Sequence, residues 1–96
     1  MPVELEVRNA INITGRGAVL IAFARGAMPM VGQVTPPLVF GTAAARRLEV
    51  IRLEKLTAME VGGIAIGLVF KAPPPLAELK RAVPPGSKLL LSDAAD

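Results

Sequence analysis

Apolar residues recur at every second position near the start of the chain, with charged residues between them. The apolar set is Val3, Leu5, Val7 and Ile11, and the charged set is Glu4, Glu6 and Arg8. A period of two predicts a strand with one buried face and one charged outer face. The segment Asn12–Gly17 follows it and predicts a tight turn, because its two glycines adopt positive φ angles at little cost.

The next segment, Ala18–Ala24, is apolar at every position. Such a run is typical of a strand that is covered on both faces. The sequence leaves two alternatives for what covers its outer face: the predicted helix at 76–83 or a partner molecule. The segment Gly26–Gly32, which contains Pro29, predicts a short connection after this strand.

Two strands are predicted at Val34–Phe40 and Val61–Lys71, with a turn at Gly41–Ala45 between the first of them and the rest of the chain. The pair Pro36-Pro37 confines the earlier strand to an edge or a bulge, because proline donates no backbone hydrogen bond. Gly67, inside the later strand, predicts the close approach of another backbone.

The segment Arg46–Glu54 predicts a further strand whose alternation changes phase. Leu48 and Val50 belong to one face, whereas the next apolar residue follows Val50 directly, at Ile51. A phase slip of this kind indicates a β-bulge or a bend at the corner of a barrel.

The last third of the chain predicts one short helix and a closing strand. Apolar residues at helical spacing in Leu76–Val83, preceded by Pro75, predict one to two turns of helix. After a turn at 84–86 comes the strand Leu89–Leu91, and residues 92–96 are expected to fray. Short strands with frequent turns favour an all-β fold, a small antiparallel barrel of six strands in a single domain spanning 1–96, with its core in about 3–91.

The composition excludes several kinds of site. The chain has no Cys and no His, which removes disulfides, thiolate nucleophiles, Cys/His zinc sites and a histidine base. We therefore expect no metal and no cofactor. Hydrophobic residues make up 52% of the chain, which argues against disorder, and the net charge of +3 is weak support for a polyanionic partner.

No targeting or membrane segment is apparent in the sequence. The first residues show neither the basic nor the apolar part of a secretory signal. The longest apolar runs, 18–24 and 61–70, are shorter than the roughly 20 residues that a helix needs to cross a bilayer. We expect a cytoplasmic protein with no membrane partner.

Glycines recur along the chain in a characteristic order. They stand in Ile13–Gly17, after the apolar strand at Gly26, within Met28–Val34 and Gly63–Leu68, and in Pro85-Gly86. This order resembles the signature of domain II of the translational GTPases, the β-barrel that follows the GTP-binding domain in elongation factor Tu and its relatives. The resemblance covers residues 3–91 and implies a six-stranded antiparallel Greek-key barrel, here as a stand-alone copy with one short helix.

The same comparison shows departures that bear on function. Gln33 stands where the family has an acid in its turn, and Arg52 is a base near a position where the aminoacyl-tRNA-binding factors tend to carry an acid. The sequence has no Gly-x-x-x-x-Gly-Lys-Ser/Thr motif. We therefore carry no tRNA-binding role over to any residue, and we expect no binding or hydrolysis of GTP.

The sequence offers no catalytic residues, and we expect a protein that is not an enzyme. The only serines, Ser87 and Ser92, lie near turns or the end of the chain with no base nearby. The loop Gly15–Gly17 lacks the helix that follows a phosphate-binding loop, because a strand follows it instead.

Two binding functions remain open. In the first, the protein binds itself or another protein through exposed apolar residues, because so short a chain cannot easily bury all of its apolar side chains. The candidates are Val19, Ile21, Phe23, Met28 and Met30. In the second, an RNA- or ribosome-associated module uses a basic face; its candidates are Arg16, Arg46, Arg47, Arg52 and Lys55. Glu49 and Glu54 lie among these bases, so an ordinary solvated strand face is the competing interpretation.

Overall fold

Strands β1 (Val3–Ile13) and β2 (Gly17–Ala24) form an antiparallel hairpin in the middle of the sheet. The computed structural model describes residues 2–60 and 63–93, and for residues 55–60 and 63 it describes the backbone alone. The turn of this hairpin has φ angles of +83° at Gly15 and +76° at Gly17, as the two glycines predict.

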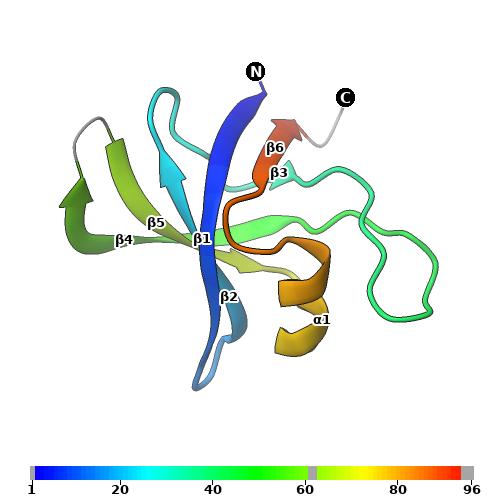
Figure 1. Cartoon of the computed structure of the whole chain (residues 1–96). Coiled ribbons are helices and arrows are strands. Elements are labelled where there is room, and N and C mark those ends of the chain that lie inside the picture. The colour runs from blue at the N-terminus through cyan, green and yellow to red at the C-terminus, as the bar shows by residue number, and fades with distance from the viewer. Residues whose placement is uncertain (1, 61–62, 94–96) are drawn as a thin grey trace.

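The remaining strands extend this hairpin on both sides into a nearly closed barrel (Figure 1). They are β3 (Gln33–Val34), β4 (Val50–Glu60), β5 (Gly63–Phe70) and β6 (Lys88–Asp93). The order across the sheet is β3-β6-β1-β2-β5-β4, and each pair of neighbours is antiparallel. An antiparallel bridge between Val34 and Glu49 joins the two edges. The prediction of an all-β barrel with six antiparallel strands is thus confirmed for the described chain.

The path of the chain around the barrel is that of a Greek key. Strands β3, β4 and β5 follow one another in space, and β2 lies on the far side of β5. The long connection from β2 to β3 therefore has to cross the upper end of the barrel (Figure 1).

Thr35 completes the barrel where proline interrupts the ladder. Its backbone N–H donates to the carbonyl of Leu48 at 2.9 Å, and its buried hydroxyl accepts the N–H of Leu48 at 2.9 Å. Pro36 and Pro37 have no N–H to continue this pairing. The predicted strand Val34–Phe40 is therefore too long: beyond Thr35, an isolated bridge joins Leu38 to Arg46 but residues 36–40 form no regular strand.

A β-bulge at Arg8 changes the faces of β1. The pairing with β2 shifts between Val7 and Asn9, so Arg8 is an extra residue in the ladder. Beyond it Ala10 is buried and Ile11 is exposed. The prediction that Ile11 shares a buried face with Val7 was wrong, because this bulge reverses the alternation.

The second bulge lies where the sequence predicts it. Val50 pairs with Phe70 and Arg52 pairs with Val69, which leaves Ile51 as the extra residue of β4. Val50 is fully buried, whereas Ile51 and Arg52 are both exposed. The bulge thus turns two consecutive side chains of β4 to the outside of the barrel.

The predicted helix is present as α1 (Leu76–Ala82). Its Leu79 and the following Val83 are buried in the same core cluster as Leu5, Leu20 and Leu91. The helix therefore packs on the interior of the barrel at its lower right in Figure 1, and it contacts β1 and β2. It does not supply the cover that was one of the two alternatives for the outer face of β2.

Two further predictions, the fraying at 92 and the backbone contact at Gly67, differ from the structure. Ser92 and Asp93 pair with Val34 and Gln33, so the chain does not fray at 92, and residues 94–96 lie outside the described part. At Gly67, an added Cβ would lie 3.3 Å from Cγ1 of Val19 and 3.7 Å from the Glu54 carbonyl oxygen, so a side chain approaches Gly67 more closely than a backbone does. Within the described residues no helix is long and apolar enough to span a bilayer.

Candidate functional site

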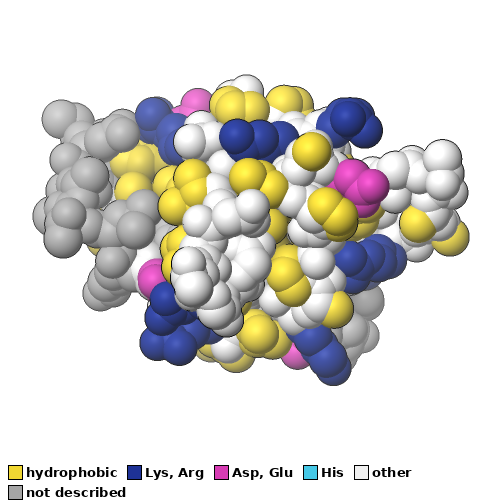
Figure 2. Space-filling model, turned by 90° about the horizontal axis from the view of Figure 1, so that it is seen from below, with side chains coloured by type: hydrophobic (Ala, Val, Ile, Leu, Met, Phe, Trp, Pro, Cys, Tyr) yellow, Lys and Arg dark blue, Asp and Glu magenta, His cyan; other side chains and the backbone are white. Residues whose placement is uncertain are grey.

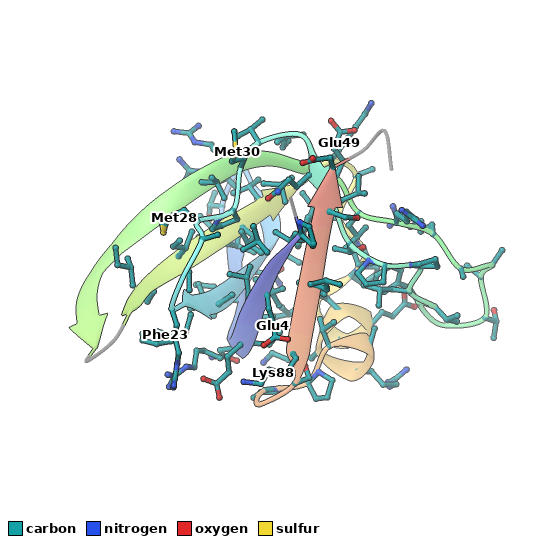
Figure 3. All side chains as sticks on the ribbon, turned by 90° about the horizontal axis from the view of Figure 1, so that it is seen from above. Glu4, Phe23, Met28, Met30, Glu49 and Lys88 are labelled. Carbon is teal, nitrogen blue, oxygen red and sulfur yellow. The ribbon has the colours of Figure 1, made fainter. Side chains whose placement is uncertain are left out.

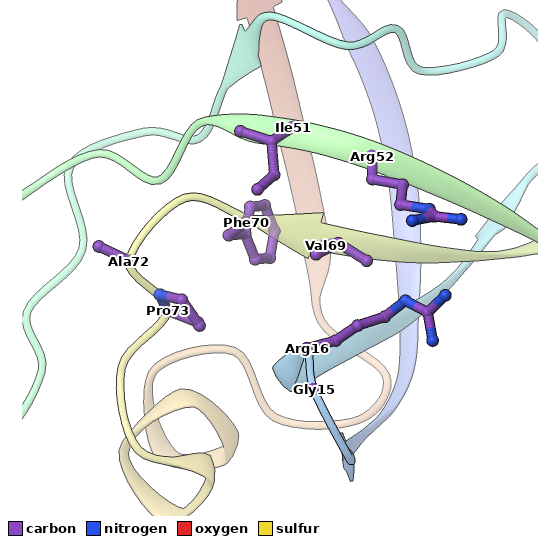
Figure 4. A pocket seen from close by; sticks show the side chains of 8 residues that line it. All are labelled: Gly15, Arg16, Ile51, Arg52, Val69, Phe70, Ala72 and Pro73. Carbon is purple, nitrogen blue, oxygen red and sulfur yellow. The ribbon is translucent and has the colours of Figure 1, made fainter.

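A pocket of about 380 Å³ opens on the outside of the barrel, between the β1–β2 turn and the start of β4 (Figure 4). The residues that line it come from four segments: Gly15, Arg16, Ile51, Arg52, Val69, Phe70, Ala72 and Pro73. Figure 4 shows Ala72 and Pro73 at one end and the side chains of Arg16 and Arg52 at the other. The pocket is therefore apolar at one end and basic at the opposite end.

The β4 bulge builds one wall of this pocket. Without the extra residue, strict alternation would place Ile51 and Arg52 on opposite faces of the strand. The bulge exposes both of them, with Arg52 opposite Val69 of β5. An apolar side chain and a guanidinium are thus presented side by side on the same surface.

The β1–β2 turn supplies the opposite wall. Nε of Arg16 lies 2.5 Å from Oε1 of Glu54 on β4, and Nε of Arg52 lies 4.0 Å from the same oxygen. The Arg16 side chain is one-third exposed and that of Arg52 nearly two-thirds exposed. Two cations therefore converge on one carboxylate, and the contact with Arg52 is the looser and more hydrated of the two.

A third arginine reaches the edge of the pocket. Nη2 of Arg46 donates to the carbonyl of Ala72 at 3.0 Å, and its guanidinium lies 5.3 Å from the centre of the Phe40 ring. Ala72 has a φ of +48°, a conformation that costs a non-glycine residue free energy. The Arg46 hydrogen bond is one contact that holds this strained residue at the pocket.

The predicted basic residues are therefore only partly brought together. Arg16 and Arg52 line the pocket, and Arg46 bonds to one of its residues. Arg47 is exposed but does not line the pocket, and the Lys55 side chain lies outside the described residues. In the view from below, Lys and Arg side chains surround the face and apolar side chains lie between them (Figure 2).

Two of the predicted interface residues are covered by the chain itself. Val19 and Phe23 are each only 1% exposed, and Ile21 is half-buried. The Phe23 ring lies under two guanidiniums, that of Arg8 at 4.6 Å and that of Arg25 at 5.3 Å from its centre. Val19 and Phe23 therefore offer no surface to a partner. At Phe23 the cover of the outer face is therefore neither the helix nor a partner molecule, but two long basic side chains.

The other two predicted interface residues are exposed on the β2–β3 connection, at the upper end of the barrel (Figure 3). Met28 is 38% exposed, Met30 is 65% exposed, and the neighbouring Val31, which the sequence reasoning missed, is 61% exposed. Pro29 between the two methionines is buried. We call Met28, Met30 and Val31 the apolar turn.

No protein-family model, curated protein or solved structure matches this chain. The resemblance to domain II of the translational GTPases thus remains an interpretation of the glycine order. Among the described residues there is no group of three or more His, Cys, Asp or Glu side chains that would hold a metal ion.

Proposed function

We propose that this protein is a non-enzymatic interaction module that associates with a second copy of itself through the apolar turn. The observation that carries the proposal is the exposure of Met30 and Val31 on a turn that the rest of the barrel holds in place. Large apolar side chains gathered on a surface commonly mark an interface. The glycine order supports kinship with a barrel that docks on neighbouring domains in a cytoplasmic family.

Hydrogen bonds to Gln33 and Val50 fix the apolar turn before any partner binds. Oε1 of the buried Gln33 accepts the N–H of Met30 at 2.8 Å, and the N–H of Gln33 donates to the Met30 carbonyl at 3.2 Å. Gly32, which precedes Gln33, donates its N–H to the carbonyl of Val50 at 2.8 Å. A preorganised surface loses less conformational entropy when it binds, which favours association.

The charge distribution favours a second copy as the partner. The segment Gly26–Val34 contains no charged side chain, although the whole chain has a net charge of +3. Two copies that meet through this segment place no like charges opposite each other at the contact. A symmetric contact of this kind is also the commonest form of homodimer.

The test is sedimentation of the wild type and of Met30→Asp over a range of protein concentrations. We expect the wild type to dimerise weakly, with a Kd on the order of 100 µM, as is usual for a small contact area. The introduced aspartates would face each other across a symmetric interface, so Met30→Asp should remain a monomer. Val39→Asp is the matched control, since Val39 is 57% exposed and lies outside the apolar turn.

Two results would overturn this proposal. One is a wild type that remains monomeric at about 1 mM, tenfold above the expected Kd. The other is a dimer that survives Met30→Asp but dissociates in Val39→Asp, which would move the interface to the loop after β3. Chemical-shift dispersion of each variant verifies that the barrel is intact.

The convergence of Arg16, Arg52 and Arg46 near one pocket favours a second candidate, an RNA-associated module. Three phosphate contacts to a single strand would give a slope of about −2 in log affinity against log salt. Replacing Arg46 by Ala removes one of these three contacts and should flatten the slope by about 0.7. Glu54 lies between Arg16 and Arg52 and repels a phosphate backbone, so we place this candidate second.

A further inference from the structure

We propose that the pocket between the β1–β2 turn and the β4 bulge binds a small amphipathic carboxylate, an apolar body with a carboxylate at one end. The site is separate from the apolar turn and does not depend on self-association. Its volume of about 380 Å³ lies within the range of small-molecule sites, at the lower end.

The apolar body of the ligand fits the end of the pocket built by Ala72 and Pro73, with Ile51 beside it. Ile51 is 48% exposed because the bulge turns it outward, so a ligand that covers it gains apolar contact. Pro73 is held close to the β1–β2 turn, with its Cγ 3.2 Å from the position that a Cβ on Gly17 would take. Both walls are thus attached to fixed elements of the barrel.

The carboxylate of the ligand fits the basic end. Arg16 and Arg52 both approach Oε1 of Glu54 through Nε, which leaves the Nη groups of both for hydrogen bonds to a ligand. Guanidinium groups bind carboxylates in bidentate, charge-assisted pairs. That a carboxylate from β4 already lies between these two arginines supports a carboxylate as the head group.

Arg52 is the residue that the ligand engages first. Its Nε lies 4.0 Å from Glu54, at the limit of an ion pair, whereas Arg16 is in close contact with the same oxygen. A ligand carboxylate can therefore take over Arg52 while Arg16 continues to neutralise Glu54. The Glu54 side chain then competes with the ligand, because both are carboxylates that bind the Arg52 guanidinium.

The test uses hexanoate as the probe and follows backbone amide chemical shifts of the full chain. We expect saturable shifts at Gly15, Ile51 and Ala72, three residues that line the pocket. Acetate supplies the head without the body and hexanol the body without the head. Each should bind at least about tenfold more weakly than hexanoate, because each lacks one of the two contacts.

Two variants with opposite expected effects distinguish binding at this pocket from nonspecific binding of hexanoate to the protein surface. Arg52→Gln should weaken hexanoate binding about tenfold, whereas Glu54→Gln should strengthen it by a similar factor, because the competing carboxylate is lost. Arg47→Gln is the matched control: it makes the same change of charge at an exposed arginine outside the pocket and should leave binding unchanged.

The natural source of the carboxylate is a free organic acid or the C-terminus of a peptide. The tripeptide Gly-Gly-Leu with a free C-terminus, compared with its C-terminal amide, distinguishes these sources. If hexanoate binds and neither peptide does, the source is a free acid. If both hexanoate and the unamidated peptide bind, the source is a chain terminus. The proposal is overturned if hexanoate shifts no pocket amide, or if acetate and hexanoate bind equally. It is also overturned if oligo(U) RNA shifts these amides while hexanoate does not.

Discussion

The guanidinium of Arg8 lies 4.6 Å from the centre of the Phe23 ring, on the outside of the barrel. Nη2 of Arg8 is also 3.5 Å from Oε1 of Glu6, and Nη2 of Arg25 approaches the same oxygen at 3.7 Å. Phe23 thus belongs to the packed structure of the monomer, although it points away from the barrel interior. The bulge at Arg8 makes this arrangement possible, because it adds a side chain to β1 next to the ring.

Phe23→Ala is expected to lower the free energy of unfolding by about 3 kcal/mol, the usual cost of removing a buried phenylalanine. Arg8→Ala should cost about 0.5–1 kcal/mol through the lost contact with the ring. Urea unfolding followed by circular dichroism measures both values. If Phe23→Ala instead gave an equally stable monomer from an associated wild type, Phe23 would be an interface residue.

Thr35→Val is expected to cost about 2 kcal/mol, because it leaves the N–H of Leu48 buried without an acceptor. Thr35→Ser keeps the hydroxyl and loses only a methyl group, so it should cost less, about 1 kcal/mol. Thr42→Val, at an exposed threonine, should change stability by less than about 0.5 kcal/mol. Equal stabilities for the Val and Ser variants at position 35 would contradict the role of this hydroxyl in closing the barrel.

Gly17→Ala is expected to destabilise the barrel more than Gly15→Ala. Both glycines have positive φ angles, so each substitution carries a backbone cost of about 1–2 kcal/mol. At Gly17 the new Cβ would also lie 3.2 Å from Cγ of Pro73, whereas at Gly15 no atom lies within 4 Å. The difference between the thermal unfolding midpoints of Gly17→Ala and Gly15→Ala therefore measures the cost of the contact with Pro73. Equal midpoints would mean that Pro73 moves away from the new Cβ at no cost.

Arg46→Ala is expected to cost about 1 kcal/mol, since it removes the hydrogen bond to Ala72 and the contact with the Phe40 ring. The neighbouring Arg47→Ala should be neutral within about 0.5 kcal/mol, because Arg47 is exposed and the described chain offers it no ion pair or hydrogen bond. Urea unfolding of the two variants at equal salt compares them directly. Equal losses would assign the effect to net charge alone.

The strand pattern and the glycines predicted most of the fold, and the two bulges show where this approach succeeds and fails. At Ile51 two apolar residues in succession disturb the alternation, so the bulge is visible in the sequence. At Arg8 the extra residue is polar and is followed by another polar residue, Asn9. A polar pair does not reveal which face either side chain occupies, so unbroken alternation assigns Ile11 to the buried face.

The candidate site was less accessible to sequence reasoning. The turn containing Arg16 and the bulge beside Arg52 were both predicted, but their meeting depends on the register of β2, β5 and β4. Charge patterns carry no information on that register. In the same way, the sequence left a helix or a partner molecule as the cover of the outer face of β2. Two arginines cover Phe23 instead, because their aliphatic stems and planar heads pack on a ring.

The position of β6 between β3 and β1 has a consequence for biosynthesis. A ribosome releases β1 to β5 first, and these strands leave two unpaired edges until residues 88–93 have emerged. Open edges of this kind template pairing with other nascent chains. The barrel therefore closes only after β6 has been synthesised, and until then the exposed edges of β1 and β3 favour aggregation of the nascent chain.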